Sequence, residues 1–230
     1  MVQLTKIYTR TGDSGRTHLS DLSSAAKTDL RIEAYGHVDE ANSVLGIATA
    51  RADLPGGLRE ILRHIQNELF DVGADLSTPI APNPPWEPLR IIAASIERLE
   101  AWCDQLSATL APLNSFILPG GTETAAHLHV ARTVVRRAER AAWRAVDEHG
   151  VDVEGGLSLP AITYLNRLSD LLFLAARVAN ASVGDVRWIP AKDRTPANPK
   201  AAARRRRIEQ AQANEERLGR TSPEGTPPAS

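Results

Sequence analysis

A short stretch near the start of the chain, YTRTGDSGRT, carries several residues that could bind an anion. Glycine lets the backbone approach a ligand closely, and successive N–H groups together with hydroxyls can cradle phosphate oxygens. A polar, glycine-rich terminus also commonly frays, so composition alone leaves both interpretations open. The candidate anion-binding residues are Thr9, Arg10, Thr11, Gly12, Asp13, Gly15 and Thr17.

A second candidate is the arginine run in RTVVRRAER, where Arg132, Arg136 and Arg140 are spaced four apart. In a helix this spacing predicts one shared face, on which like charges repel unless an anion or acidic partners lie opposite. The planar guanidinium group fits phosphate oxygens and carboxylates equally well. Two interpretations therefore remain open: a phosphate site, or a basic strip paired with acids of a neighbouring helix.

Two further sets of polar residues lie where apolar residues are expected. Asn166, Asp170 and Arg177 follow one face of a predicted helix, directly beside its leucine stripe, so they would face a neighbouring helix or a cleft. Asp39 lies in the middle of another predicted helix, where no helix-end dipole favours a negative charge. We expect Asp39 to need a cationic partner, and the arginines of residues 132–140 are the obvious source.

Other residue types that commonly do chemistry indicate no further site. The six histidines lack the spacing typical of zinc ligands, and we interpret them as structural or surface residues. The sequence contains no P-loop, no GxGxxG after a strand and no serine elbow, which argues against the common α/β nucleotide enzymes. A single cysteine, Cys103, excludes a disulfide within the chain.

Hydrophobic periodicity predicts the elements that position these residues. Apolar side chains recur at helical spacing, proline and glycine mark the breaks, and strand-like alternation is confined to scraps such as VRWI. We therefore predict an all-α fold, an antiparallel bundle of five helices. The predicted helices span residues 29–52, 58–78, 89 to near Pro112, 122–150 and 161–181.

The fourth predicted helix has two features that determine its place. Thr122 or Thr124 can cap its start, and Gly150 ends it. Its apolar stripe consists of small residues, which let helices approach closely and predict a central position in the bundle. The stripe contains Ala131, Val134, Val135, Ala138 and Ala142.

Composition limits the organisation and the partners of the chain. Residues 1–190 are expected to form one domain, with 1–28 as an N-terminal loop and 191–230 as a basic, mostly disordered tail. The run of arginines at 204–207 could bind RNA or an anionic surface, but a solvated charge run is commoner in such tails. A formal charge of −1 and the lack of a long apolar run argue against nucleic-acid and membrane partners, and we expect a cytoplasmic protein.

Five segments together resemble, in order and spacing, the PduO-type ATP:cob(I)alamin adenosyltransferases. They are YTRTGDSGRT, RIEAYGHVDEANSVLG, IQNELFDVGADLSTP, FILPGGTETAAHLHVARTVVRRAER and YLNRLSDLLFLAAR. The resemblance implies a five-helix bundle assembled as a homotrimer, with active sites between adjacent subunits. It also implies the reaction, in which the cobalt of cob(I)alamin attacks the 5′ carbon of ATP to give adenosylcobalamin and triphosphate.

The resemblance implies roles for the candidate residues. The N-terminal segment would fold over the ATP phosphates, with Lys27 as a further phosphate ligand. Arg132 and Asp39 would pair across the subunit interface, Asn166 would lie near Mg²⁺ and the triphosphate, and Asp170 would support the site. The nucleotide contacts implied on the fourth helix are Arg136, Arg137 and Glu139.

Phe116 has two interpretations. The resemblance implies that it displaces the lower axial ligand of cob(II)alamin, which leaves the cobalt four-coordinate and easier to reduce. From the sequence alone, an aromatic residue at a helix start is more often part of the core. The reaction itself needs no proton abstraction, because cobalt(I) is a strong nucleophile. Orienting ATP and stabilising the leaving triphosphate would suffice, and Arg136 with Mg²⁺ could do both.

Two other function classes remain as alternatives. One is a non-catalytic corrinoid carrier that delivers cobalamin to a dependent enzyme, and the other is a helical module whose arginines bind acidic partners or RNA. The polar set of the N-terminal loop, including Asp13 and Thr17, disfavours both, because neither needs a triphosphate loop. For the enzyme, the further partners we expect are a corrinoid reductase and a cobalamin-dependent mutase.

Overall fold

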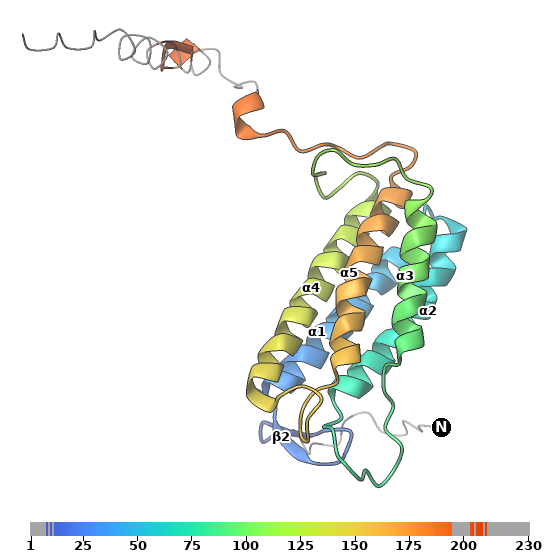
Figure 1. Ribbon diagram of the computed structural model, residues 1–230, viewed down its shortest axis with the longest axis vertical. Coiled ribbons are helices and arrows are strands. Elements are labelled where there is room, and N and C mark those ends of the chain that lie inside the picture. The colour runs from blue at the N-terminus through green and yellow to red at the C-terminus, as the bar shows by residue number, and fades with distance from the viewer. Residues whose placement is uncertain are drawn as a thin grey trace, which may run out of the picture. The chain divides into compact units, whose positions relative to one another are not determined.

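The computed structural model describes residues 8, 10, 12–194, 203–204, 206–208 and 210. The chain divides into two compact units, residues 1–187 and 188–230. The second unit contains the 3-10 helix η1 (Ala191–Asp193), and the first contains a helical bundle (Figure 1). The elements of the first unit are β1 (Arg16–His18), β2 (Ser24–Ala26), α1 (Leu30–Thr49), α2 (Gly56–Leu76), α3 (Ala93–Ser107), α4 (Glu123–His149) and α5 (Leu159–Ala179).

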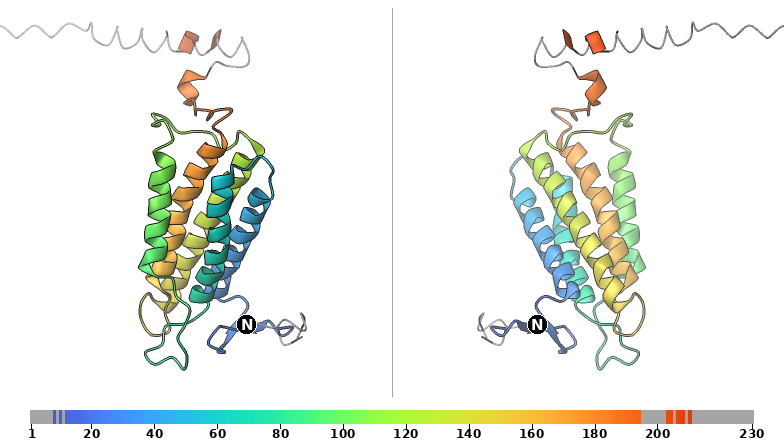
Figure 2. Two further views of the ribbon diagram at one scale, coloured as in Figure 1. Left: turned by 90° about the vertical axis from the view of Figure 1, so that its right-hand side faces the viewer. Right: turned by 90° about the vertical axis from the view of Figure 1, so that its left-hand side faces the viewer.

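The predicted antiparallel five-helix bundle is confirmed in the described part of the chain. Helix α4 packs against both α1 and α5, α2 packs on α1, and α3 packs on α5 (Figures 1 and 2). Among the described residues, no helix combines the length and the apolar character needed to cross a membrane. The prediction of disorder in the tail falls mainly on residues outside the described part and stays a prediction.

The small-residue stripe of α4 is buried against its two neighbours, as predicted. Ala131, Val135, Ala138 and Ala142 are fully buried and Val134 is nearly so. Side chains of this size let α1 and α5 approach α4 closely along its length. The longer side chains of α4 must therefore emerge at its edges.

Local signals set the ends of α1 and α4. Asp29 caps α1 by accepting a hydrogen bond from the Arg31 backbone N–H at 2.8 Å. Of the two predicted caps for α4, Thr122 is the one used, and its hydroxyl accepts from the Ala125 N–H at 3.1 Å. Gly150 ends the helix with a φ of 84°, a backbone conformation that glycine adopts without strain.

The ends of α1, α2, α4 and α5 lie within three residues of the predicted ends, but α3 and the N-terminal loop differ more. Helix α3 ends at Ser107 and not near Pro112. Helix α3 begins at Ala93 and not at residue 89, because a fully buried Asp75 carboxylate holds the preceding segment extended. Its oxygens accept from Arg90 Nη1 at 2.6 Å and from the Ile91 N–H at 2.8 Å. The second difference is the β1–β2 hairpin inside the predicted N-terminal loop, in which Arg16 pairs with Ala26.

A buried arginine anchors the end of the bundle that carries the hairpin. Arg31 exposes only 2% of its surface. Its guanidinium donates to the carbonyl of Leu76 at the end of α2 and to those of Gly155 and Gly156 in the α4–α5 loop, at 2.8, 2.6 and 3.2 Å. One cation thus binds carbonyl groups from two chain segments and holds the end of α2 to the α4–α5 loop.

A buried histidine in α4 has no hydrogen-bond partner for either ring nitrogen among the described residues. His129 exposes 4% of its surface, and its ring meets that of Phe173 edge-on, with 6.3 Å between the centroids. Burial lowers the pKa of His129, and the positive charge of Arg132 lowers it further. The imidazole is therefore neutral in the folded protein at neutral pH.

We predict that His129 makes the protein less stable in mild acid. In the unfolded chain a histidine binds a proton near its ordinary pKa of about 6.5, whereas folded His129 does so only at lower pH. Between these two values the unfolded chain holds more protons, so the free energy of unfolding falls as the pH drops below about 6.5. The His129→Leu variant should lose less stability than wild type between about pH 7 and pH 5 in thermal unfolding.

The matched control is His127→Leu, on the same helix but only partly buried. It should retain the pH dependence of the wild type. Equal pH dependence in the His129→Leu variant and the wild type would contradict the assignment to His129.

Candidate functional site

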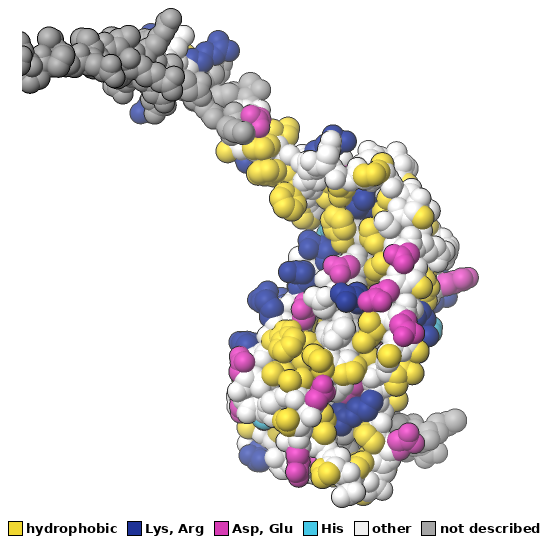
Figure 3. Space-filling view, in the orientation of Figure 1, with side chains coloured by type: hydrophobic (Ala, Val, Ile, Leu, Met, Phe, Trp, Pro, Cys, Tyr) yellow, Lys and Arg dark blue, Asp and Glu magenta, His cyan; other side chains and the backbone are white. Residues whose placement is uncertain are grey.

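The arginines of α4 and the polar side chains of α5 meet at a cavity of about 590 Å³ between α3, α4 and α5. Arg132 and Arg136 line it from α4, and Asp170 and Phe173 line it from α5. The space-filling view shows basic side chains gathered along the edge of the molecule that α4 forms (Figure 3). The lining as a whole combines three arginines and three acidic side chains with the aromatic ring of Phe173.

Arg132 and Arg136 have no ion-pair partner among the residues that the structure describes. Burial lowers the pKa of Arg132, as does the positive charge of Arg136 beside it, and the Arg132 Nε is buried without a hydrogen-bond partner. Two neighbouring guanidinium groups without a counter-ion favour an anion. The phosphate-site interpretation thus suits this side of α4.

Other arginines of α4 fit the alternative interpretation, in which they pair with acidic residues of a neighbouring helix. Arg137 pairs with Glu40 and Arg144 pairs with Glu33, both on α1, and the hydrogen bond from Arg137 lowers the pKa of Glu40. Arg140 lines a separate hollow beside these pairs, so the prediction of one shared face with Arg132 and Arg136 is wrong for Arg140. The reason is helical drift, since each step of four residues turns the side chain by about 40°.

Asp39 is not brought to the arginines of α4 within one chain. It is exposed on α1 and lines a small hollow with Asn42 of α1 and Phe70 of α2, whereas Arg132 lines the α3–α4–α5 cavity. No ion pair of Asp39 occurs among the described residues, and Arg137 pairs with the adjacent Glu40 instead. The expected ion pair of Asp39 is therefore not formed among the residues that the structure describes.

Asn166 belongs to a hydrogen-bonded chain that crosses from α4 to α3. Its Nδ2 donates to Glu139 Oε1 at 3.1 Å, and its Oδ1 accepts from Arg167 Nη1 at 3.0 Å. Arg167 Nε in turn donates to Glu100 Oε1 at 2.7 Å. The structure thus connects two predicted nucleotide contacts, Asn166 and Glu139, in a single chain of hydrogen bonds.

The predicted anion-binding loop is compact where the structure describes it. The Gly15 N–H donates to the Gly12 carbonyl at 3.3 Å, and the Lys27 N–H donates to the Gly15 carbonyl at 2.8 Å. A Cβ on Gly12 would lie 3.0 Å from Lys27 Nζ, so this ammonium lies directly over the loop. Gly15 has a φ of 78°, which other residues rarely adopt.

The remaining members of the N-terminal set are only partly described. Arg10 and Asp13 are exposed, and Thr17 lies in the middle of β1. Thr9 and Thr11 lie outside the described residues. The hairpin is attached to the end of α2, where the Ser20 N–H donates to the Ser77 carbonyl at 3.2 Å.

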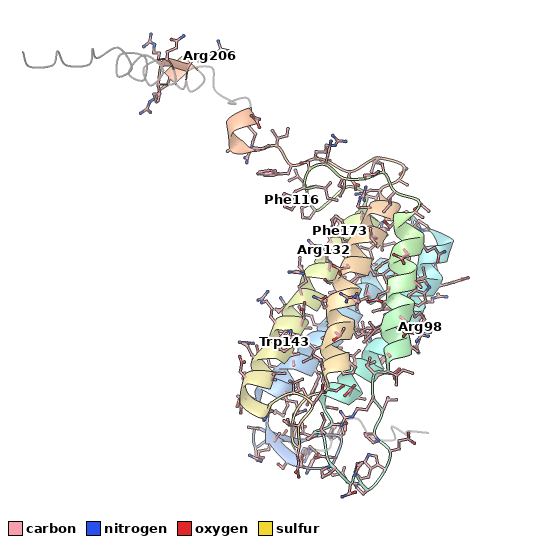
Figure 4. The ribbon with its side chains drawn as sticks, in the orientation of Figure 1. Arg98, Phe116, Arg132, Trp143, Phe173 and Arg206 are labelled. Carbon is pink, nitrogen blue, oxygen red and sulfur yellow. The ribbon has the colours of Figure 1, made fainter. Side chains whose placement is uncertain are left out.

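Phe116 lies at the other end of the bundle, in the loop between α3 and α4 (Figure 4). It exposes 79% of its surface, so the interpretation as a core phenylalanine is wrong. Leu118 and Val186 beside it are also exposed, and the Leu118 N–H donates to the Val186 carbonyl at 2.8 Å. These residues offer an apolar surface suited to a large, partly apolar ligand.

The end of α5 fixes the loop that carries Phe116. Asn180, which is 2% exposed, donates to the Gly120 carbonyl at 2.9 Å and accepts from the Thr122 N–H at 2.9 Å. A Cβ on Gly121 would lie 2.1 Å from Asn180 Oδ1, so only glycine allows this approach. Arg177 donates to the Ala111 carbonyl at 2.8 Å and holds the start of the loop.

Sequence reasoning missed Arg167, Asn180 and the unpartnered state of His129. Arg167 directly follows Asn166 and therefore lies off the four-residue steps used to find the polar face. Asn180 lies at the end of a predicted helix, where polar residues are ordinary. Cys103 also lines the cavity, but burial raises its pKa to about 11, so it is a protonated thiol at neutral pH.

The sequence is similar to those of cobalamin and corrinoid adenosyltransferases. Residues 7–179 match the family model described as cobalamin adenosyltransferase. A corrinoid adenosyltransferase of Mycobacterium tuberculosis is 59% identical over 194 residues, which cover 84% of this chain and 98% of that protein. A corrinoid adenosyltransferase of Bacillus subtilis is 39% identical over 80% of this chain and 92% of its own.

Solved structures agree with this similarity. A variant of the PduO-type ATP:corrinoid adenosyltransferase of Lactobacillus reuteri, complexed with cobalamin and ATP, superposes with a TM-score of 0.72 at 35% identity. The match covers 80% of this chain and 100% of that one. Sequence and fold together place the chain in the cobalamin adenosyltransferase family.

Proposed function

We propose that the chain transfers the 5′-deoxyadenosyl group of ATP to the cobalt of cob(I)alamin. The cobalt(I) centre donates its electron pair to the 5′ carbon of ATP, a cobalt–carbon bond forms, and the bond from that carbon to the triphosphate oxygen breaks. The products are adenosylcobalamin and triphosphate. Family membership supports this reaction, and one feature of the cavity carries it: within the described part of the chain, neither Arg132 nor Arg136 forms an ion pair with an acidic residue.

Arg136 is proposed to stabilise the triphosphate as it leaves. Negative charge builds up on the leaving oxygen in the transition state, and a guanidinium already in place lowers its energy without reorganisation. The N-terminal loop would hold the rest of the triphosphate, since Lys27 lies over Gly12 and backbone N–H groups of the loop are close by. These groups orient ATP for in-line attack.

The residues around Asn166 fit Mg²⁺. Magnesium prefers oxygen ligands, and this chain of hydrogen bonds contains two: the Glu139 carboxylate, which accepts from Asn166 Nδ2, and Asn166 Oδ1 at the other end of the amide. When bound there with ATP, the ion would neutralise part of the triphosphate charge. Asn166 and Glu139 would then hold the ATP phosphates on the α4–α5 side, and Asp170 would support them.

Phe116 is proposed to act on cob(II)alamin before the transfer. Its exposed ring and the apolar groups around it can take the space below the corrin in place of the lower axial ligand. The loop that carries it is held by buried hydrogen bonds from Asn180 and Arg177, so the ring is presented without a large loss of conformational freedom. Four-coordinate cob(II)alamin would then be reduced more readily.

A homotrimer with sites between subunits is proposed as the active assembly. Among the described residues of one chain, Asp39 and Arg132 each lack an ion-pair partner, which supports a pair between them across an interface. We further propose a cytoplasmic location, a corrinoid reductase as the electron source and a cobalamin-dependent mutase as the recipient of the product.

The reaction is tested anaerobically with chemically reduced cob(I)alamin, ATP and Mg²⁺, following the visible spectrum and identifying the nucleotide product. We expect one triphosphate for each adenosylcobalamin formed. The Arg136→Ala variant should lower kcat by about 100-fold, as removal of one preorganised donor typically does. The control Arg144→Ala, on the same helix but paired with Glu33, should turn over like wild type. Binding of cobalamin without conversion would point to a carrier and overturn the proposal.

The role of Phe116 is tested by the Phe116→Ala variant. Burying a phenylalanine ring contributes about 1.5–3 kcal/mol, so four-coordinate cob(II)alamin should fall by roughly 10- to 100-fold in its magnetic circular dichroism or EPR spectrum. Turnover with prereduced cob(I)alamin should change less. Trp86→Ala, another exposed aromatic residue in a loop, is the control. An unchanged cob(II)alamin spectrum would remove the role of Phe116.

The subunit pair is tested by charge reversal and sedimentation. Asp39→Arg and Arg132→Asp should each dissociate the trimer, because a repulsive or unpaired charge at an interface costs about 2–5 kcal/mol. The double variant restores opposite charges and should recover the trimer. Glu60→Arg, an exposed acid on α2, controls for net charge. A double variant that dissociates as readily as the single variants would contradict a direct pair.

A further inference from the structure

Arg167 is the third arginine that lines the α3–α4–α5 cavity, but its surroundings differ from those of Arg132 and Arg136. Its Nε donates to Glu100 Oε1 on α3 at 2.7 Å, and this hydrogen bond raises the pKa of Arg167. Its Nη1 donates to Asn166 Oδ1 at 3.0 Å. Arg167 therefore already has hydrogen-bond partners, one of them a carboxylate.

The charges around Arg167 argue against direct phosphate binding. Glu100 and Asp170 line the same cavity, and their negative charges act on Arg167. No acidic group acts comparably on Arg132, and neither Arg132 nor Arg136 forms an ion pair among the described residues. An anion that enters the cavity is therefore attracted to the arginines of α4. Arg167 instead forms hydrogen bonds with the neighbouring side chains.

The neighbour on which Arg167 acts is Asn166. The two ends of the Asn166 amide make different bonds: Oδ1 accepts from Arg167, and Nδ2 donates to Glu139 Oε1 at 3.1 Å. An amide rotated by 180° would place its NH₂ group against the guanidinium and its oxygen against the carboxylate, and both hydrogen bonds would be lost. The two bonds together therefore define one orientation of the amide.

We propose that Arg167, braced by Glu100, is a positioning residue that fixes the Asn166 amide for the magnesium–ATP complex. The inference rests on the proposed function, because it takes Asn166 to be a nucleotide-site residue. A carbonyl oxygen accepts two hydrogen bonds or ligands, so one acceptor site of Oδ1 remains when Arg167 occupies the other. Glu100 ties this arrangement to α3, a helix from which no nucleotide contact was predicted.

The test measures MgATP binding by calorimetry and turnover separately. Arg167→Gln should weaken MgATP binding by about 10-fold, the lower end of what losing an outer hydrogen-bond partner typically costs, with little change in the KM for cob(I)alamin. Glu100→Gln should shift binding in the same direction by a smaller factor. The double variant should be no worse than Arg167→Gln, because the two residues act as one unit.

A second cycle separates positioning from a structural role. In an Asn166→Ala background, Arg167→Gln should leave MgATP binding unchanged, since the amide on which it acts is gone. Arg167→Lys keeps the charge but loses the planar fork, and it should recover binding only in part. The control is Arg51→Gln, whose side chain is 36% exposed like that of Arg167 and also forms an ion pair between elements.

Several results would overturn the inference. Loss of kcat at unchanged MgATP affinity would place Arg167 at the reacting groups, and a full effect in the Asn166→Ala background would give it direct contact with ATP. An equal loss of MgATP affinity in Arg51→Gln would show that the effect of Arg167→Gln comes from a general loss of protein stability. These outcomes are distinct from failure of the proposed function, which would appear as wild-type protein that forms no adenosylcobalamin.

Discussion

The close packing of α4 between α1 and α5 is the constraint on which the rest of the structure depends. Alanine and valine form most of both contacts, so the helices approach closely and leave little interior space for long side chains; Leu128 and His129 are the larger side chains that α4 buries. The guanidinium groups of α4 must emerge at one of its two edges. Arg132 and Arg136 emerge beside α5 and form no ion pair among the described residues, whereas Arg137 and Arg144 emerge beside α1 and pair with Glu40 and Glu33. Packing therefore separates cations that can bind an anion from cations that are already neutralised.

At each end of the bundle, a buried polar side chain forms hydrogen bonds to backbone groups and so holds a loop in place. Arg31 joins the end of α2 to the α4–α5 loop near the N-terminal hairpin, and Asn180 joins α5 to the loop that carries Phe116. Partners of this kind satisfy buried carbonyl and N–H groups that would otherwise destabilise the fold. They also explain how an exposed aromatic side chain such as Phe116 can have a defined place.

Prediction from the sequence succeeded where the cause is local or periodic. The cap of α4 at Thr122, its end at Gly150 and its buried stripe all follow from neighbouring residues or from a repeat of 3.6. It failed where a residue distant in sequence decides the outcome. The start of α3 was misplaced because Asp75 holds the preceding segment extended, and the hairpin was missed because its strands have only three residues each.

The sequence by itself determined the helical class, the order of the helices and the set of residues that could bind an anion, because these depend on residue type and spacing along one chain. Only the tertiary structure decided which of these residues lie together, which are exposed and which form ion pairs. It separated Arg140 from Arg136, exposed Phe116, left Asp39 without a cation and brought Arg167 to Asn166 and Glu100. The physical reason is that burial and ion pairing depend on which helices lie side by side, and a pattern within one helix shows its faces but not what covers them.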